Sequence, residues 1–287
     1  MGTNARQVNV SRLCCKAGVS RQSYYQYCKR ERAYTTEVDR IVNEVRLIRN
    51  RNPRMGGRKL LDKIRSVLNR EGIEIGRDRF FDILRSNSLL VKKKRRYHRT
   101  TNSHHHFYKY KNMIRDLPIR QPNEVWVSDL TYIRTSEGFL YLSLVSDLYS
   151  RKILGYEVSD NLETIGCLKA LKMAFKELPE GSCPVHHSDR GIQYCSRPYV
   201  ETLREKGINI SMTEENHCYE NAVAERINGI LKDEYLLGIN FKTKSIARTA
   251  CRQAVHYYNT DRPHLSLDMK TPDDVFYAAV KKRPKCY

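Results

Sequence analysis

The 287-residue chain lacks any long apolar run. No stretch approaches the roughly 18 residues that a membrane-spanning helix needs, and the polar, arginine-containing start has no signal-peptide core. A membrane-spanning or secreted protein is therefore not expected, and we expect the chain to be cytoplasmic.

Cysteine pairs with the spacing of metal ligands are also absent. The nine cysteines are an odd number, scattered along the chain without a C-x-x-C motif. Neither a disulfide framework nor a zinc ribbon is indicated, and reduced thiols are the simplest interpretation. Residues 104–106 are three histidines, but no cysteine pair at zinc-finger spacing lies near them, so they do not predict a zinc site.

Acidic residues are scarce in residues 1–120, which carry 30 Lys and Arg against 10 Asp and Glu. Residues 121–287 carry 22 of each sign, so the whole net charge of +20 belongs to the first part. Lysine and arginine contacts to phosphate release counterions and give affinity that does not depend on sequence. The charge distribution therefore indicates a polyanionic partner. Nucleic acid is the leading candidate, and a basic protein without such a partner is the alternative.

Two short helices across a glycine turn are predicted in residues 1–32. A glycine ends the first helix, and a serine two positions later provides the N-cap of the second. This pattern indicates a helix-turn-helix. If it binds DNA, then Arg21, Gln22 and Tyr25 open the recognition helix and face the groove. The alternative is a small helical hairpin that packs on another element.

Residues 33–90 show the apolar spacing of three further helices, over 36–50, 57–71 and 77–86. A stretch with one proline and two glycines separates the first two of them. Their remaining faces are rich in Arg and Lys, which fits either DNA contact or an ordinary solvated surface. We therefore expect a second all-α module here.

A dense basic run opens the segment 91–120. It contains five consecutive cations: Lys92, Lys93, Lys94, Arg95 and Arg96. A polar stretch follows it. Blocks of like charge are commonly mobile and often bind nucleic acid, so we expect a basic linker that contacts DNA.

From residue 121 the pattern changes to strands and helices. Short runs bounded by turn residues predict five strands: 125–135, 139–149, 153–159, 184–189 and 208–212. Helical apolar spacing predicts three helices: 163–178, 197–206 and 220–236. The order βββαβαβα gives a mixed sheet flanked by helices. An α/β domain is expected over 121–239, followed by a basic helical tail over 240–287.

Three acids of this domain each lie on a different predicted element. Asp129 lies in the first strand, Asp189 at the end of the fourth, and Glu225 on the last helix, with 35 residues between the second acid and the third. The first and fourth strands are neighbours in the sheet that this order suggests, so the three carboxylates can converge. Carboxylate oxygens are the preferred ligands of Mg²⁺ or Mn²⁺, and two such ions about 4 Å apart support phosphoryl transfer. Any one of these acids alone would more simply be a cap, a turn residue or an ion-pair partner.

The last predicted helix carries a polar stripe. Asn221, Glu225 and Lys232 recur on it at helical spacing, apart from the apolar stripe that faces the core. Lys232 is a candidate for contact with a phosphate near the metals, and Asn221 for a further DNA contact. An ordinary solvated face is the alternative. Asp147, at the end of the second strand, is a rival ligand, although the residues after it are typical of a turn.

These residues resemble the catalytic domain of retroviral-integrase-like transposases, in particular the second-reading-frame (OrfB) product of bacterial insertion sequences of the IS-three group. The resemblance is carried by the stretches 126–133, 147–155, 186–194 and 221–225. Tail residues match as well: Tyr258, Asn259, Arg262, Pro263, His264, Thr271 and Pro272. Together they cover most of residues 120–275. The helical modules before residue 90 are similar to the helix-turn-helix regions of this family.

The resemblance implies an RNase H-like catalytic core that transfers DNA strands. Water releases a 3′-OH at an element end, and that 3′-OH attacks another phosphodiester, commonly joining one end to the other to give a circular intermediate. By position, Asp129, Asp189 and Glu225 match the metal ligands of the family, which hold Mg²⁺ or Mn²⁺ as two ions. Lys232 matches the basic residue found seven positions after the glutamate. The implied partners are double-stranded DNA of the element ends and the target, and further copies of the chain in a synaptic complex.

Two residues depart from the family pattern, and both bear on local DNA contacts. Glu220 stands where aspartate is usual, and Arg226 follows the glutamate where serine is more typical. The family often makes its active enzyme as a frameshift fusion with an upstream product, and the sequence fits either the complete enzyme or the downstream half. Two alternatives to a strand transferase remain: a DNA-binding regulator whose triad is unused, and an RNase H-type nuclease that acts on hybrids.

Overall fold

The computed structural model describes residues 9–92, 107–214 and 221–281. The chain forms two compact units, one made of Met1–Asn50 with Gly56–Leu90 and the other of Arg51–Met55 with Val91–Tyr287. None of the described helices is long and apolar enough to cross a lipid bilayer. The described cysteines are all free, which agrees with the absence of a disulfide pattern.

The first unit is helical in its described part. Its elements are α1 (Val10–Lys16), α2 (Arg21–Arg51), α3 (Gly57–Arg70) and α4 (Arg77–Ser86). Asn9 caps α1 by accepting a hydrogen bond from the backbone N of Arg12 at 3.2 Å, and Gly18 adopts a φ of 66° in the turn before α2. Buried apolar side chains of three helices form the core: Ile41, Val42, Val45, Leu60, Leu61, Ile64, Leu68, Phe80, Ile83 and Leu84. A helix, a glycine turn and a second helix thus occur where the sequence predicted them.

The helix α2 is much longer than predicted. One helix was expected to end before residue 33 and another to begin at 36, whereas α2 runs unbroken for 31 residues. No glycine or proline occurs between Ser20 and Pro53, so nothing in the backbone stops the helix. The boundary expected between residues 32 and 33 therefore lies inside a helix.

The second unit contains a mixed five-stranded sheet. Its strands are β1 (Val125–Thr135), β2 (Gly138–Asp147), β3 (Ile153–Ser159), β4 (Val185–Ser188) and β5 (Asn209–Met212). They lie in the order β3-β2-β1-β4-β5, with β2 antiparallel to both of its neighbours and β4 parallel to both of its own. This confirms the predicted mixed sheet and the predicted pairing of the first strand with the fourth.

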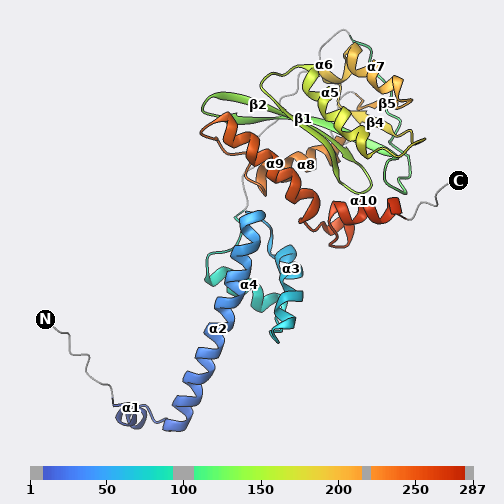
Figure 1. Cartoon of the computed structure of the whole chain (residues 1–287). Helices are drawn as coiled ribbons and strands as arrows, with labels where there is room; N and C mark the ends of the chain where they lie inside the picture. Colours follow the sequence, from blue (N-terminus) through green and yellow to red (C-terminus); the bar gives the residue numbers. More distant parts are fainter. Residues whose placement is uncertain (1–8, 93–106, 215–220, 282–287) are drawn as a thin grey trace. The chain divides into compact units, whose positions relative to one another are not determined.

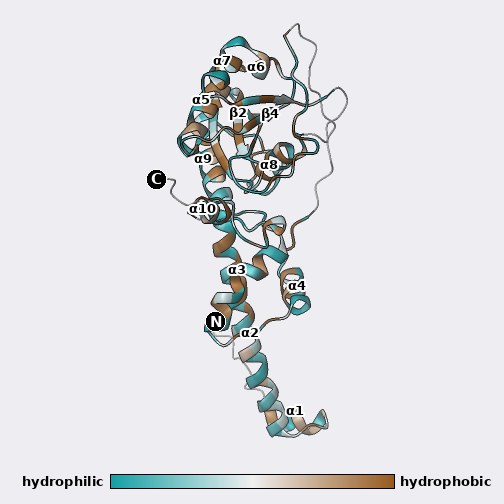
Figure 2. Cartoon of the chain, turned by 90° about the vertical axis from the view of Figure 1, so that its right-hand side faces the viewer, coloured by the Kyte–Doolittle hydropathy of each residue, from teal (hydrophilic) through white to brown (hydrophobic). Residues whose placement is uncertain are grey.

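Helices cover both faces of this sheet (Figure 1). They are α5 (Thr164–Ala174), α6 (Ile192–Cys195), α7 (Arg197–Glu205), α8 (Ala222–Asp233), α9 (Lys244–Thr260) and α10 (Pro272–Lys281). One apolar cluster joins the sheet to α8 and α9, and a second, around Trp126, joins it to α5 and α7. Figure 2 shows the corresponding brown colour on the strands in the interior of this unit. The two clusters fix the helices that carry the candidate site.

Two segments expected to lie outside the α/β domain pack on it instead. In the second half of the expected linker, the backbone N of Met113 donates to Oγ of Ser211 on β5 at 2.8 Å, and Ile114 and Ile119 pack against β1. In the expected tail, α9 contributes buried side chains to the same cluster as α8. Spaced apolar residues in both segments favour packing on the domain. The net positive charge of these segments predicted a linker and a tail instead.

Candidate active site

Asp129 and Asp189 follow matched positions on neighbouring parallel strands. β1 and β4 pair up to Ser128 opposite Ser188, and each aspartate is the next residue. Asp129 is only 8% exposed, whereas Asp189 is partly exposed. Oδ1 of Asp189 accepts a hydrogen bond from the backbone N of Gly191 at 3.0 Å in the turn that leads to α6. The two predicted acids therefore lie side by side where β4 ends.

Both aspartates also act on one buried tyrosine. Burial raises the pKa of the Tyr194 hydroxyl well above its ordinary value, and the charges of Asp129 and Asp189 raise it further. This hydroxyl, on α6, has no hydrogen-bond partner among the described residues. Both carboxylates therefore lie within electrostatic reach of the same hydroxyl.

Two asparagines attach α8, and with it the third acid, to β1. Nδ2 of Asn221 donates to the backbone O of Ser128 at 3.1 Å, and Nδ2 of Asn228 donates to Oδ2 of Asp129 at 2.8 Å. Both asparagines are buried. Glu225 is half-buried on the same face of α8, one turn from each. The helical spacing seen in the sequence therefore brings Glu225 to the part of β1 that carries Asp129.

The three acids do not form a ready-made ligand set. Within residues 9–92, 107–214 and 221–281, no group of three His, Cys, Asp or Glu side chains is gathered closely enough to hold a metal ion. Carboxylates repel one another at short range. The oxygens of Asp129 accept hydrogen bonds from Asn228 and from the backbone N of Leu130, at 2.8 and 2.9 Å. The role of the three acids as metal ligands stays a prediction.

The chemistry of this region fits a divalent cation. Mg²⁺ and Mn²⁺ take oxygen ligands, and the three carboxylates belong to β1, to the turn after β4 and to α8. In addition, the side-chain oxygens of Asn221 and Asn228 are buried there without a described hydrogen-bond partner. The region thus contains two buried amide oxygens that lack a described hydrogen-bond partner.

His186 on β4, which the sequence did not predict as a site residue, forms hydrogen bonds with residues of β1 and α7. Nε2 of His186, on β4, lies 2.8 Å from Oγ of Ser128 and 2.9 Å from the hydroxyl of Tyr199. Burial lowers the pKa of His186 to about 3, and His187 contributes in the same direction, so the ring is neutral at physiological pH. The hydrogen bonds fix the backbone one residue before Asp129. The only signal in the sequence was a histidine placed within an apolar strand.

Lys232 contacts an aromatic ring of β1. Its Nζ atom is 4.4 Å from the centroid of the Tyr132 ring. Burial lowers the pKa of the ammonium, and the charge of Asp129 acts in the opposite direction. Lys232 therefore contacts Tyr132 and lies within electrostatic reach of Asp129.

Comparison with known proteins gives the family. Two models of the integrase core domain match residues 119–218 and 206–272. The transposase InsF of the insertion sequence IS3A from Escherichia coli is 28% identical over 266 residues, which cover 90% of each chain. The uncharacterized 31 kDa protein of insertion element IS600 from Shigella sonnei is 33% identical over 263 residues, which cover 91% of this chain and 96% of the relative. The chain belongs to the IS3 family of insertion-sequence transposases.

The chain is also similar to a further transposase and to a solved integrase core. The transposase of insertion sequence element IS629 from Shigella sonnei is 29% identical over 285 residues, which cover 96% of this transposase and 94% of the relative. The HTLV-2 integrase catalytic core domain, solved in complex with magnesium, is 20% identical with a TM-score of 0.44, covering 54% of this chain and 97% of that one. The mixed sheet with its flanking helices is an integrase core, which has the RNase H-like fold expected from the sequence.

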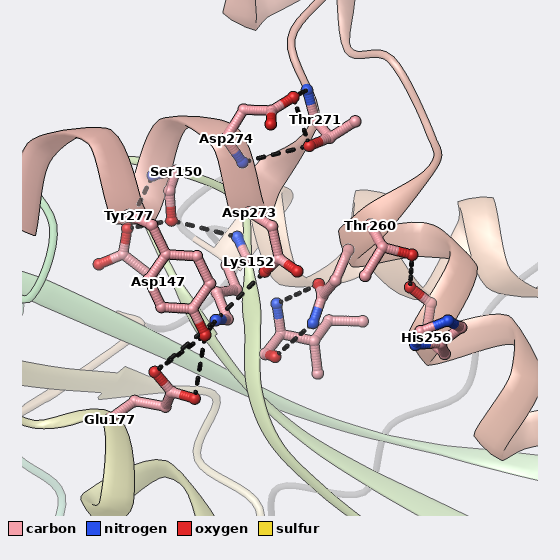
Figure 3. Close-up of polar contacts among 12 residues, drawn as sticks. Asp147, Ser150, Lys152, Glu177, His256, Thr260, Thr271, Asp273, Asp274 and Tyr277 are labelled. Atoms are coloured by element: carbon pink, nitrogen blue, oxygen red, sulfur yellow. Dashed lines mark hydrogen bonds and ion pairs between the residues drawn. The ribbon is translucent and has the colours of Figure 1, made fainter.

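Asp147 of the transposase, the rival ligand, stabilises a turn. Its carboxylate accepts hydrogen bonds from the backbone N of Asn123 at 2.8 Å, and from the backbone N and Oγ of Ser150 at 2.7 and 2.6 Å. Burial raises the pKa of this carboxyl, while the bonds to Ser150 lower it. Figure 3 shows Asp147 beside Ser150 at the end of β2. These hydrogen bonds explain the burial of the Asp147 carboxylate without a role as a metal ligand.

The tail residues shared with the family hold the tail to the core. Asn259, on α9, bonds both backbone atoms of Ile153, with its Oδ1 2.9 Å from the backbone N and its Nδ2 2.8 Å from the O. Arg262 forms two hydrogen bonds with the carboxylate of Glu234, at 2.8 and 2.7 Å. These contacts stabilise the fold. Asn259 and Arg262 therefore have a structural role in this part of the family pattern.

A buried lysine holds α10 in the same way (Figure 3). Nζ of Lys152 lies 3.1 Å from Oδ1 of Asp273 and 3.7 Å from Oε2 of Glu177. It also lies 3.8 Å from the centroid of the Tyr277 ring. The lysine side chain is 6% exposed, so these partners replace its lost hydration.

The predicted DNA contacts of the N-terminal part are exposed where they are described. Arg21, Gln22 and Tyr25 lie at the start of α2 with exposed side chains, and Lys92 is exposed too. The other four cations of the basic run lie outside the described residues: Lys93, Lys94, Arg95 and Arg96. The three histidines at 104–106 and Glu220 also lie outside them. Exposure permits DNA contact by the four described residues but does not establish it.

Proposed function

We propose that this transposase is a metal-dependent DNA strand transferase that acts at the ends of its insertion sequence. The hydrogen bond from Asn228 to Asp129 carries the proposal, because it ties the helix of Glu225 to the strand that neighbours Asp189. Integrase-core transposases are generally DDE polynucleotidyl transferases, and the family therefore supports the same assignment.

The proposed reaction has two steps, the hydrolysis of one phosphodiester bond and then a transesterification at a second phosphodiester. Water first attacks a phosphorus at the element end, the bond to the 3′ oxygen breaks, and that oxygen takes up a proton to become a 3′-OH. The 3′-OH then loses its proton, attacks the phosphorus of a second phosphodiester and displaces the 3′ oxygen there. The number of bonds is unchanged in the second step, so no high-energy cofactor is needed.

The residues of the candidate site have separate roles in this proposal. Asp129, Asp189 and Glu225 would hold Mg²⁺ or Mn²⁺ through their carboxylate oxygens. When bound, two such ions activate the attacking oxygen and stabilise the leaving oxygen. Asn228 orients the carboxylate of Asp129, and Lys232 supplies a positive charge for a phosphate beside the acids.

DNA binding is proposed for the basic parts of the chain. Double-stranded DNA of the element ends and the target would contact the start of α2 through Arg21, Gln22 and Tyr25, and the basic run that begins at Lys92. Asn221, predicted as a further DNA contact, is buried and donates to the backbone O of Ser128, so we do not propose it as a DNA contact. Bringing two ends together requires more than one copy of the chain, and an upstream-frame protein is a further proposed partner.

A second candidate function is a DNA-binding regulator of transposition whose acids are unused. It is favoured by one observation: the acids do not form a ligand set within the described residues. Such a regulator would bind the element ends and would compete with an active enzyme without joining DNA.

Joining of labelled DNA separates these candidates. Purified full-length protein is incubated with duplexes that carry the terminal sequence of its insertion element, with Mg²⁺. The parent should release a 3′-OH and join it to a second strand, and Asp189→Asn should do neither while it binds DNA as the parent does.

The matched control is Asp116→Asn, which removes an exposed carboxylate of the same unit. It should join DNA at the parental rate. Joining by Asp189→Asn at that rate would remove the enzymatic proposal, and a parent that binds the ends but joins none would favour the regulator.

A further inference from the structure

The hairpin of β1 and β2 has two unlike faces beyond the candidate acids. On one face Ile133, Leu140 and Leu142 are buried in the cluster with α8 and α9. The turn of the hairpin lies at the start of α9, away from α5, so none of the described helices covers the opposite face there (Figure 1). Strand residues alternate between faces, which places Tyr132 and Phe139 on the open side.

These two aromatic side chains are half-exposed neighbours. Tyr132 is 49% exposed and Phe139 is 50% exposed. Their rings pack edge to face, with centroids 5.8 Å apart and planes at 89°. In the register of the hairpin, Tyr132 lies opposite Tyr141 and Phe139 lies opposite Arg134, so the open face carries three aromatic rings and one cation. Exposed apolar surface gathered in this way usually marks a binding surface.

Two cations flank the rings. Nζ of Lys232 lies 4.4 Å from the centroid of the Tyr132 ring, and the guanidinium carbon of Arg134 lies 5.9 Å from it. The one acid of the turn, Glu137, is engaged by the backbone N of Lys244 at 2.8 Å. The open face is therefore aromatic and positively charged, which complements a nucleotide in both its base and its phosphate.

Asp129 lies on the covered face with Ile133, but a side chain of α8 connects it to the open face. Tyr132 comes three residues after Asp129 on β1, and Lys232 contacts Tyr132 while it lies within electrostatic reach of Asp129. Lys232, one turn after Asn228 on α8, thus connects the surroundings of Asp129 to the Tyr132 ring. This position distinguishes the open face from the other exposed aromatic side chains of the unit.

We propose that Tyr132, supported by Phe139, stacks on the nucleobase next to the phosphate that reacts, while Lys232 and Arg134 contact the flanking phosphates. The ligand class is a terminal nucleotide of the element end, unpaired from its complement. This inference rests on the proposed function, because it places a base beside the proposed reaction site. A base stacks on an aromatic ring whatever its identity, so the contact would hold the strand and would not read its sequence.

Photo-crosslinking tests the contact without any need for catalysis. Full-length Asp189→Asn protein is mixed with duplexes that carry the terminal sequence of the element and 5-iododeoxyuridine at successive positions near the end. Long-wavelength light couples this base to an aromatic side chain on which it stacks, and mass spectrometry of the digested protein locates the coupled residue. Coupling at Tyr132, confined to positions next to the reacting phosphate, is expected. Coupling elsewhere, or equal coupling along the whole duplex, would overturn the proposal.

Substitutions provide the second measurement. Tyr132→Ala should weaken binding of the frayed end by about 5- to 150-fold, as expected for the loss of one stacked base, and Tyr132→Phe should bind as the parent does. Tyr108→Ala, which removes an aromatic side chain that is 74% exposed, should change nothing. Parental affinity of Tyr132→Ala would count against stacking. If that variant fails to fold, the crosslink in the Asp189→Asn protein, which keeps Tyr132, decides.

The outcomes also separate this inference from the proposed function. A crosslink at Tyr132 in a protein whose parent joins no DNA would support the contact and reject the enzyme. Joining by a parent without that crosslink would leave the enzyme and reject the contact. A change of oligomeric state in Tyr132→Ala, with unchanged DNA affinity, would show that a second copy of the chain covers the open face, and would overturn the proposal.

Discussion

Asn228 on α8 donates a hydrogen bond from Nδ2 to Oδ2 of Asp129 on β1, at 2.8 Å. Both residues are buried, and 98 residues of chain separate them, so the bond is a product of the fold. It links the helix of Glu225 to a predicted metal ligand.

Asn228→Ala should reduce strand joining and stability together. The substitution leaves a buried carboxylate oxygen of Asp129 without its donor, which costs about 1–3 kcal/mol of folding free energy. Joining should fall about 10- to 100-fold, as is typical when a metal ligand loses the partner that orients it. Asn240→Ala removes an exposed asparagine and is the control. Urea unfolding and the joining assay measure the two effects, and parental values of both for Asn228→Ala would show that the bond orients nothing.

Lys152→Ala should detach α10 from the core. The buried ammonium is the cation that faces Asp273, Glu177 and the Tyr277 ring, and its removal leaves these groups without it. Because both carboxylates are partly exposed, we expect a loss of roughly 1–3 kcal/mol in the free energy of unfolding. Lys169→Ala breaks a more exposed ion pair with Glu157 and should change this quantity by less than about 1 kcal/mol. Equal losses in urea unfolding would contradict the role of Lys152.

His186 should make the protein less stable as the pH falls. Its pKa is about 3 in the folded chain because of burial, against about 6.5 in an unfolded chain. Between these values the unfolded chain binds a proton that the folded chain does not bind. Stability is therefore fully present above the unfolded pKa and is lost toward acid pH, by up to about 1.4 kcal/mol per pH unit.

The test of this sign is His186→Gln. Urea unfolding from neutral pH down to about pH 4 should show a flatter loss of stability in the variant than in the parent. His256→Gln, which changes an exposed histidine, should keep the parental slope. A slope in His186→Gln that matches the parent would mean that another group causes the acid sensitivity.

Arg21→Ala should reduce both DNA affinity and its dependence on salt. If Arg21 contacts one phosphate, the slope of the logarithm of affinity against the logarithm of salt concentration should fall by about 0.9. Arg197→Ala removes an arginine that is strongly exposed but paired with Glu201, and serves as the control. Fluorescence anisotropy at several salt concentrations gives the slopes. An unchanged slope for Arg21→Ala would mean that DNA does not bind at the start of α2.

The sequence predicted the elements of the core because their apolar spacing is local. The five strands, the helices between them and the pairing of β1 with β4 all occur as expected. The length of α2 differs from the prediction. The helix-turn-helix pattern predicts that a helix ends before residue 33, but no glycine or proline stops the helix there. The packing of residues 107–120 was missed because charge outweighed a few apolar residues.

Within the candidate site, only the three acids could be predicted from the sequence. Asp129, Asp189 and Glu225 were found from their contexts and from the spacing of the last two. The partners of these acids were not, because Asn228 on Asp129 and His186 on Ser128 are contacts over 99 and 58 positions that no local pattern encodes. The open face at Tyr132 was missed for the same reason, since a tyrosine in a strand is most simply part of a core.

Binding of Mn²⁺ to the DNA complex tests the central claim most directly. Electron paramagnetic resonance of free Mn²⁺ counts the ions that the parent, Glu225→Gln and the exposed control Glu205→Gln each bind. The account predicts that Glu225→Gln binds fewer ions, or binds them more weakly, than the other two proteins, and joins no DNA. Equal Mn²⁺ binding and equal joining by all three proteins would contradict it.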